Sequence, residues 1–203
     1  MLTRASITER LKTASPTGEA LAGDHALNPG MGVQGDLKAA AVLVALVDRP
    51  DGLTVLLTRR TDDLEHHPGQ ISFPGGHVDA GDKDATAAAL RELEEETGIA
   101  PTHVTVAGTL ATYVTRTGFS IEPVIGFLDP GFTLAPDPKE VAEVFEVPLA
   151  FLMDPANHQR MSREFEGKMR YYYAMPYGDY YIWGATAGML RNLHTVLTGE
   201  PVA

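Results

Sequence analysis

The sequence contains no cysteine among its 203 residues. This absence excludes a disulfide framework, a thiolate zinc site, an iron–sulfur cluster and a thiol nucleophile. Redox chemistry that runs through cysteine sulfur is therefore excluded as well.

Positive charge is also scarce. Sixteen lysines and arginines stand against 27 aspartates and glutamates, which leaves a formal net charge of −11. We therefore expect neither a nucleic-acid polymer nor an anionic membrane surface as a partner. The negative charge is concentrated, because residues 79–98 hold seven carboxylates and two basic side chains, or five of the eleven excess charges.

Long apolar runs are missing too. The longest stretch, residues 39–47, has nine residues, less than half of what a membrane-spanning helix needs, and the first twelve residues lack the apolar core of a signal peptide. We therefore expect a soluble, cytoplasmic protein.

A chain of 203 residues with 44% hydrophobic content can build one substantial core. Residues 1–36 are predicted to form an N-terminal helix over 6–14, capped by Ser6 or Thr8, and an extended or mobile lead-in over 15–35. Residues 37–203 are predicted to form the main domain. Its expected elements are strands at 39–47, 53–59, 103–113, 119–128 and 171–181, a sharp bend at Pro74-Gly75-Gly76, and helices at 84–97 and 185–197. This mixture predicts an α/β or α+β layered fold.

The helix predicted at 84–97 carries a carboxylate face. At 100° per residue, Glu92, Glu95 and Glu96 lie within an arc of about 100°, whereas Glu94 points away. Arg91 is predicted to balance Glu95 through their i, i+4 spacing. The remaining charge favours a hard cation, Mg²⁺ or Mn²⁺, because every ligand in the group is an oxygen. Taken alone, the same pattern is also compatible with a solvated acidic face.

Residues 75–99, GGHVDAGDKDATAAALRELEEETGI, resemble the signature box of the nudix hydrolases. Residues 91–99 match that family's R-E-U-x-E-E-x-G-U pattern, in which U is aliphatic, at every defined position. The first half of the box departs from the pattern, because Asp82 replaces a glutamate and one extra residue precedes Arg91.

Two further segments resemble the coenzyme A pyrophosphatase branch of this superfamily. Residues 56–61, LLTRRT, and residues 67–76, HPGQISFPGG, are similar to the motif that precedes the box in that branch, and residues 140–149 and 182–187 are similar to later stretches. Glu65 stands where the branch motif has an arginine.

The resemblance implies a nudix-type α/β/α sandwich with a mixed β-sheet. It also implies hydrolysis of coenzyme A or its thioesters to 4′-phosphopantetheine and 3′,5′-ADP. ADP-ribose, NADH and a nucleoside triphosphate are the alternative substrates, and a nucleotide-binding domain without catalysis is the alternative function. The resemblance also suggests a homodimer.

The resemblance further assigns roles to residues of this chain. Glu92, Glu95 and Glu96 would bind one to three Mg²⁺ or Mn²⁺ ions, and Arg91 would orient a glutamate. The general base would be Glu95 or, as second choice, Glu140. The substrate-binding residues would be Arg60, Gly75 and Gly76.

Aromatic residues and several charged residues outside the box have more than one possible role. The tyrosines at 171–173, 177, 180 and 181 could stack on an adenine, but they are expected to supply core or subunit contacts, and Trp183 is expected in the core. Arg59 is expected to face solvent or to pair with a surface acid. Glu143 is expected to be solvated, and His66 and His67 to form hydrogen bonds within a loop.

Overall fold

The computed structural model describes residues 2–13, 23–30, 36–63, 67–165 and 167–200. Its helices and strands are α1 (Arg4–Thr13), α2 (Gly23–Leu27), β1 (Lys38–Arg49), β2 (Gly52–Arg60), β3 (Ile71–Ser72), β4 (Gly75–His77), α3 (Ala85–Thr97), β5 (Val104–Thr109), β6 (Tyr113–Val114), β7 (Phe119–Leu128), β8 (Val141–Pro148), α4 (Leu149–Leu152), β9 (Gln159–Phe165), β10 (Lys168–Tyr177), β11 (Tyr180–Trp183) and α5 (Ala185–Thr198), with 3₁₀ turns at Pro101–His103 and Pro155–Asn157. Glu65 and His66 lie outside the described residues.

The central sheet is mixed. Strands β3, β2, β1, β7 and β5 lie side by side in this order. In addition, β4 pairs with β1, β6 pairs with β7, and β8 pairs with β2. Strands β1 and β7 run parallel over ten paired residues, whereas β1 and β2, the strands predicted at 39–47 and 53–59, form an antiparallel hairpin. The near-continuous burial of β1 fits a strand that is covered on both faces.

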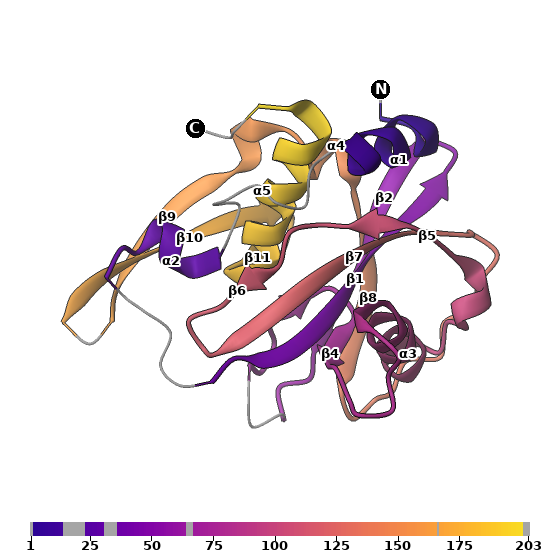
Figure 1. Cartoon of the computed structure of the whole chain (residues 1–203), viewed down its shortest axis with the longest axis horizontal. Helices are drawn as coiled ribbons and strands as arrows, with labels where there is room; N and C mark the ends of the chain where they lie inside the picture. The colour runs from indigo at the N-terminus through magenta and orange to yellow at the C-terminus, as the bar shows by residue number, and fades with distance from the viewer. Residues whose placement is uncertain (1, 14–22, 31–35, 64–66, 166, 201–203) are drawn as a thin grey trace.

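Two hydrophobic clusters cover the two faces of this sheet. One joins α1 and α5 to the sheet through Ile7, Leu11, Leu190 and Leu193. The other joins α3 to the opposite face through Ala88, Ala89 and Leu93. Figure 1 shows α1 and α5 on one side of the sheet and α3 on the other. The α/β/α sandwich expected from the sequence is confirmed.

The N-terminal region differs from the expected structure. Helix α1 begins at Arg4, earlier than predicted, because the Thr3 hydroxyl accepts a hydrogen bond from the Ser6 N–H and makes Thr3 the cap. Part of the predicted extended lead-in is helical, since α2 lies within it. Asn28 fixes this segment by donating to the Tyr171 carbonyl and accepting from the Tyr171 N–H.

A second sheet of three antiparallel strands, β9, β10 and β11, was predicted only in part. The aromatic stretch at 171–181 is confirmed as strand, but it forms two strands joined at a tight turn. The predicted strand at 103–113 is likewise divided into β5 and β6 by residues 110–112, and β5 itself carries a register shift between Val106 and Gly108. Among the described helices, none is long and apolar enough to cross a bilayer.

The glycine pair forms strand β4 rather than the predicted bend. Gly75 and Gly76 pair with Val42 and Ala41 of β1. A Cβ on Gly75 would overlap the Ala41 carbonyl oxygen, and a Cβ on Gly76 would overlap the Glu92 carboxylate. Glycine is therefore needed here for close approach, which lets β4 lie between β1 and α3.

We expect Gly75→Ala to lower the free energy of unfolding by about 1–3 kcal/mol, since the added methyl meets backbone atoms that cannot move aside. The matched control is Gly131→Ala, where a Cβ would meet nothing within 4 Å. Urea unfolding followed by circular dichroism measures both variants. Equal midpoints for the two would contradict the close approach of β4 to β1.

Candidate active site

Helix α3 presents the carboxylates, and local signals set its two ends. The Asp84 side chain caps the first turn by accepting a hydrogen bond from the Ala87 N–H at 2.9 Å. Gly98 ends the helix in the left-handed conformation, with φ at 74°, and donates to the Glu94 carbonyl. The helix predicted at 84–97 is confirmed, with Asp84 as its cap.

The three glutamates of the predicted face differ in exposure. Glu95 is exposed and Glu92 is half-buried, whereas Glu96 is only 4% exposed. Strand β4 causes this difference, since it covers the part of the helix face from which Glu92 and Glu96 project. The carboxylates therefore occupy a gradient from solvent to interior.

Glu96 is the most perturbed carboxyl group of the site. Its pKa is raised to about 8, chiefly by burial and also by the charges of Glu92 and Glu140, while Arg60 and the Gly75 N–H oppose the shift. Its Oε2 atom is buried and has no hydrogen-bond partner among the described residues. An orphaned carboxylate oxygen of this kind is costly unless a proton or a cation satisfies it.

Glu92 shares this environment. Burial raises its pKa, the charges of Glu95 and Glu140 add to the effect, and Arg91 opposes it. Because Glu140 acts on both Glu92 and Glu96, the structure places these three acids near one another. Glu140 belongs to a loop that is fastened to α3, since the Asp137 N–H donates to the Glu96 carbonyl at 3.1 Å.

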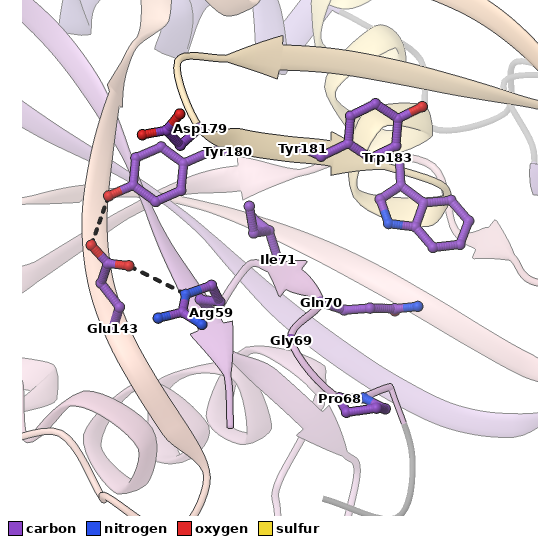
Figure 2. A pocket seen from close by; sticks show the side chains of 10 residues that line it. All are labelled: Arg59, Pro68, Gly69, Gln70, Ile71, Glu143, Asp179, Tyr180, Tyr181 and Trp183. Atoms are coloured by element: carbon purple, nitrogen blue, oxygen red, sulfur yellow. Dashed lines mark hydrogen bonds and ion pairs between the residues drawn. The ribbon is translucent and has the colours of Figure 1, made fainter. Parts of the chain in front are cut away.

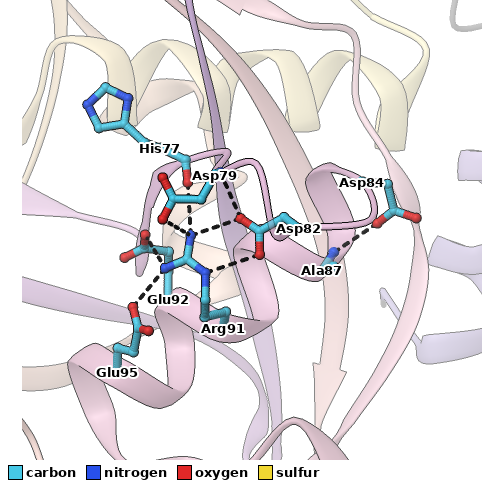
Figure 3. Close-up of polar contacts among 8 residues, drawn as sticks. All are labelled: His77, Asp79, Asp82, Asp84, Ala87, Arg91, Glu92 and Glu95. Carbon is cyan, nitrogen blue, oxygen red and sulfur yellow. Dashed lines mark hydrogen bonds and ion pairs between the residues drawn. The ribbon is translucent and has the colours of Figure 1, made fainter.

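Arg91 supplies the positive charge at the helix surface (Figure 3). Its Nη1 donates to Glu92 at 2.8 Å and to Glu95 at 2.7 Å, so the predicted pairing with Glu95 is present. Its Nε and Nη2 donate to the two oxygens of Asp82, and Nη2 also donates to the His77 carbonyl. The hydrogen bonds to Asp82 are the main reason that the pKa of Arg91 is raised.

Asp82 acts as the anchor of Arg91. The hydrogen bond from Arg91 and a second one from the Asp79 N–H hold the pKa of Asp82 below its usual range. Sequence reasoning missed this role, and it also missed the His77 carbonyl. The spacing Asp79-x-Gly81-Asp82 is the available signal, because it is typical of a tight turn closed by an aspartate side chain.

Arg60 approaches the cluster from β2. Its charge lowers the proton affinity of Glu96, and its Nε atom is buried without a hydrogen-bond partner among the described residues. The backbone on either side is fixed, since the Arg60 N–H donates to the Gln70 carbonyl and the Thr61 N–H to the Glu140 carbonyl. An unpartnered guanidinium nitrogen beside acids could bind an anionic group.

The predicted site residues come together in one region. Arg60 of β2, the two glycines of β4, the loop residue Glu140 and the α3 residues Arg91, Glu92, Glu95 and Glu96 all belong to it. Within the part of the chain that the structure describes, no three acidic or histidine side chains already converge as a metal site. The donor set nevertheless fits a hard divalent cation, because it consists of carboxylates and includes the orphaned Glu96 Oε2.

Two charged residues outside the box contact each other. Arg59 pairs with Glu143 at 3.3 Å, which confirms the expected pairing with an acid. Glu143 is not simply solvated, because it also accepts a hydrogen bond from the Tyr180 hydroxyl at 2.7 Å. Strand β8, which carries Glu143, was not predicted, because its glutamates conceal the apolar alternation of a strand.

Comparisons with known proteins agree with this architecture. A model of the NUDIX domain matches residues 37–166. A protein of Photorhabdus laumondii, called uncharacterized Nudix hydrolase NudL, is 40% identical over 154 residues, which cover 76% of this chain and 82% of that protein. The Escherichia coli protein of the same name is 41% identical over 165 residues, which cover 81% and 85%.

Among solved structures, a Caenorhabditis elegans Ap4A hydrolase binary complex is similar with a TM-score of 0.46 and 24% identity, over 55% of this chain and 80% of that one.

The pKa of Glu96 predicts a pH dependence of stability in metal-free protein. This pKa lies above its ordinary value of 4.5, at about 8, so the folded state holds the proton more tightly than the unfolded state. The stabilisation is complete below pH 4.5 and is lost as pH rises towards 8, at no more than about 1.4 kcal/mol per pH unit.

Glu96→Gln cannot titrate and should lack this component. Urea unfolding in the presence of a chelator, at several pH values, measures the difference between wild type and variant, so that all other titrating groups cancel. The exposed Glu94→Gln is the matched control and should follow the wild type. Parallel profiles for wild type and Glu96→Gln would contradict the burial of a titrating carboxyl group.

Proposed function

The chain belongs to the NUDIX domain family, and from this premise we propose that it is a metal-dependent hydrolase of the diphosphate bond in coenzyme A or its thioesters. The products would be 4′-phosphopantetheine and 3′,5′-ADP. Nudix hydrolases act on small nucleotide derivatives and generally use divalent metal ions. The observation that carries the proposal is the buried, orphaned Glu96 carboxylate among Glu92, Glu140 and Arg60.

We assign metal binding to Glu92, Glu95 and Glu96, with Mg²⁺ or Mn²⁺ as the ion. Bound there, the ion would offset the charge of the diphosphate and lower the pKa of a coordinated water. Glu96 would then exchange a costly unsatisfied oxygen for a ligand bond. Arg91 would keep Glu92 and Glu95 in place, because it is itself fixed by Asp82.

The remaining groups would bind and orient the substrate. Arg60 has a free guanidinium nitrogen beside the carboxylates, which suits contact with a phosphate oxygen. Gly75 and Gly76 bring backbone groups, with no side chain in the way, to the edge of the cluster. Glu95 is the first candidate for the general base because it is the most exposed of the three glutamates on the carboxylate face, and Glu140 is the second.

Coenzyme A is favoured by the segments at 56–61 and 67–76, which resemble the motif of coenzyme A pyrophosphatases. Glu65 in place of an arginine is the observation that favours another diphosphate, so ADP-ribose, NADH and a nucleoside triphosphate remain alternatives. A nucleotide-binding domain without catalysis is disfavoured, because all three box glutamates are present. A cytoplasmic location and a homodimer complete the proposal.

The substrate is tested by incubating the purified protein with coenzyme A, ADP-ribose, NADH and dATP, each with Mg²⁺ or Mn²⁺, and separating the products. We expect coenzyme A to be cleaved fastest and to yield 4′-phosphopantetheine and 3′,5′-ADP. Added chelator should abolish cleavage. Turnover of ADP-ribose alone would refute the coenzyme A assignment. If none of the four compounds were turned over, the proposed hydrolase activity would be refuted.

Site variants test the carboxylate assignments. Glu92→Gln and Glu96→Gln should each lower kcat by roughly 100-fold or more, because they remove ligands from the metal. Glu94→Gln, on the opposite side of the same helix, should retain full activity. Circular dichroism of each variant checks that the fold is unchanged.

The base is identified by comparing Glu95→Gln with Glu140→Gln. Loss of a general base costs about 10²–10⁴-fold in kcat and removes the rise of the rate with pH. We expect this behaviour for Glu95→Gln and a smaller loss for Glu140→Gln. The reverse order would transfer the role of base to Glu140.

A further inference from the structure

Strand β9 forms the outer edge of the three-stranded sheet. It pairs with β10 on one side, and among the described residues no strand pairs with its other side. Residues 159–164 of this strand are all exposed. Its pairing with β10 is continuous from Gln159 to Phe165, so the edge is regular along its whole length. A regular, exposed edge of this kind is a template for pairing with a further strand.

The contacts of β10 show which backbone groups of β9 point outwards. Asn28 accepts a hydrogen bond from the Tyr171 N–H at 2.8 Å and donates one to the Tyr171 carbonyl at 3.0 Å. Both backbone groups of Tyr171 therefore point away from β9. Ser162 lies opposite Tyr171, so these two residues form a pair without mutual hydrogen bonds. The N–H and C=O groups of Ser162, and by alternation those of Arg160 and Glu164, are directed to the outer edge.

The order of these three residues is self-complementary. When a second β9 lies antiparallel to the first with the two Ser162 residues opposite each other, Arg160 of each copy faces Glu164 of the other. All three facing pairs consist of outward-directed residues, so each pair can exchange two backbone hydrogen bonds. A shift of two residues in either direction would remove both charge pairs. Charged residues normally protect a strand edge from pairing, but here their order favours one register with two-fold symmetry.

The side chains on this face suit the pairing. The Arg160 guanidinium lies 4.4 Å from the centroid of the Tyr171 ring. A guanidinium that is stacked on a ring keeps the N–H groups of its edge for a carboxylate. Ser162 stands between Arg160 and Glu164 on the same face. Its small side chain leaves room for the second copy at the symmetry axis.

On the other face of the sheet, a long side chain turns away from the edge. Arg163 reaches back across β10, and its guanidinium lies 5.3 Å from the centroid of the Trp183 ring. The core position expected for Trp183 is wrong, because this residue is only half-buried, and Figure 2 shows it beside Tyr181 on one side of β11. Met161 is 38% exposed. In the register above, the Met161 residues of the two copies lie diagonally across the axis and can make an apolar contact.

The local charge also favours an approach at this edge. Two copies of a chain with a formal net charge of −11 repel each other at long range. Residues 159–170, which include β9 and the start of β10, hold four basic and two acidic side chains and so carry a net charge of +2. This basic segment lowers the repulsion, because it is attracted by the excess negative charge of the other copy.

We propose that two copies of this chain associate through β9 and join their three-stranded sheets into one sheet of six strands, with the two-fold axis at Ser162. This inference rests on the homodimer of the proposed function and locates its interface, and it is independent of the hydrolase chemistry. The contact is only one strand wide, so it is smaller than the interfaces of stable dimers. We therefore expect a dimer that dissociates on dilution.

Sedimentation velocity of the full-length protein over a wide range of concentrations measures this association. Arg160→Glu and Glu164→Arg each place like charges opposite each other at both ends of the interface. Each variant should therefore weaken dimerisation by roughly 10-fold or more. Lys12→Glu makes the same change of charge as Arg160→Glu at an exposed position of helix α1. It is the matched control and should dimerise like the wild type.

A mixture of the two variants separates a lost contact from a damaged fold. One copy with Arg160→Glu and one with Glu164→Arg again have opposite charges at both ends of the interface. We expect the mixture, and the double variant, to dimerise with nearly the wild-type affinity. Circular dichroism checks the fold of each variant.

Three outcomes would overturn the proposal. A dimer that persists unchanged in both single variants would place the interface elsewhere on the chain. Weakened single variants that neither the mixture nor the double variant rescues would contradict the register. A wild-type protein that is monomeric at every concentration would overturn this inference and the proposed homodimer together, whereas the hydrolysis assay tests the enzyme separately.

Discussion

The close contact between strand β4 and helix α3 is the constraint on which the candidate site depends. Gly75 and Gly76 leave no side chain between the two elements, so the backbone of β4 lies directly against the Glu92 carboxylate. Glu96 is buried by the same contact and loses its hydration without gaining a partner for Oε2. A larger residue in either position would separate the elements and return the carboxylates to water, where they would be ordinary acids.

Arg91 offsets part of the repulsion between these carboxylates but does not neutralise all of their charge. Its guanidinium binds Glu92, Glu95 and Asp82 at once and lies 3.7 Å from Asp79, which spreads one positive charge over four acids. Glu96 receives no contact from it and keeps a strongly raised pKa. The folded chain therefore retains a local excess of negative charge after its internal pairs have formed, and a divalent cation is the natural means of offsetting that excess.

Local sequence signals made helix α3 predictable. Contacts between segments that are distant in the sequence could not be predicted in this way. Asp84 and Gly98 act within one turn of α3, so a helix over 84–97 is predictable from residues close to it in the sequence. Strand β4 has three residues and exists only through its pairing with β1. In the same way, the carboxylate face of α3 followed from helical periodicity, but the differing burial of Glu95 and Glu96 depends on how far β4 extends over that face.

The alternation of side chains along β2 explains how Arg59 and Arg60 serve different sites. Successive residues of a strand project to opposite faces of the sheet, and the register shift opposite these two arginines lies on the β8 side of the ladder. Arg59 neutralises Glu143 on one face, while Arg60 remains available to the carboxylate cluster on the other. Neighbouring residues of one strand thus serve an ion pair on one face of the sheet and the carboxylate cluster on the other.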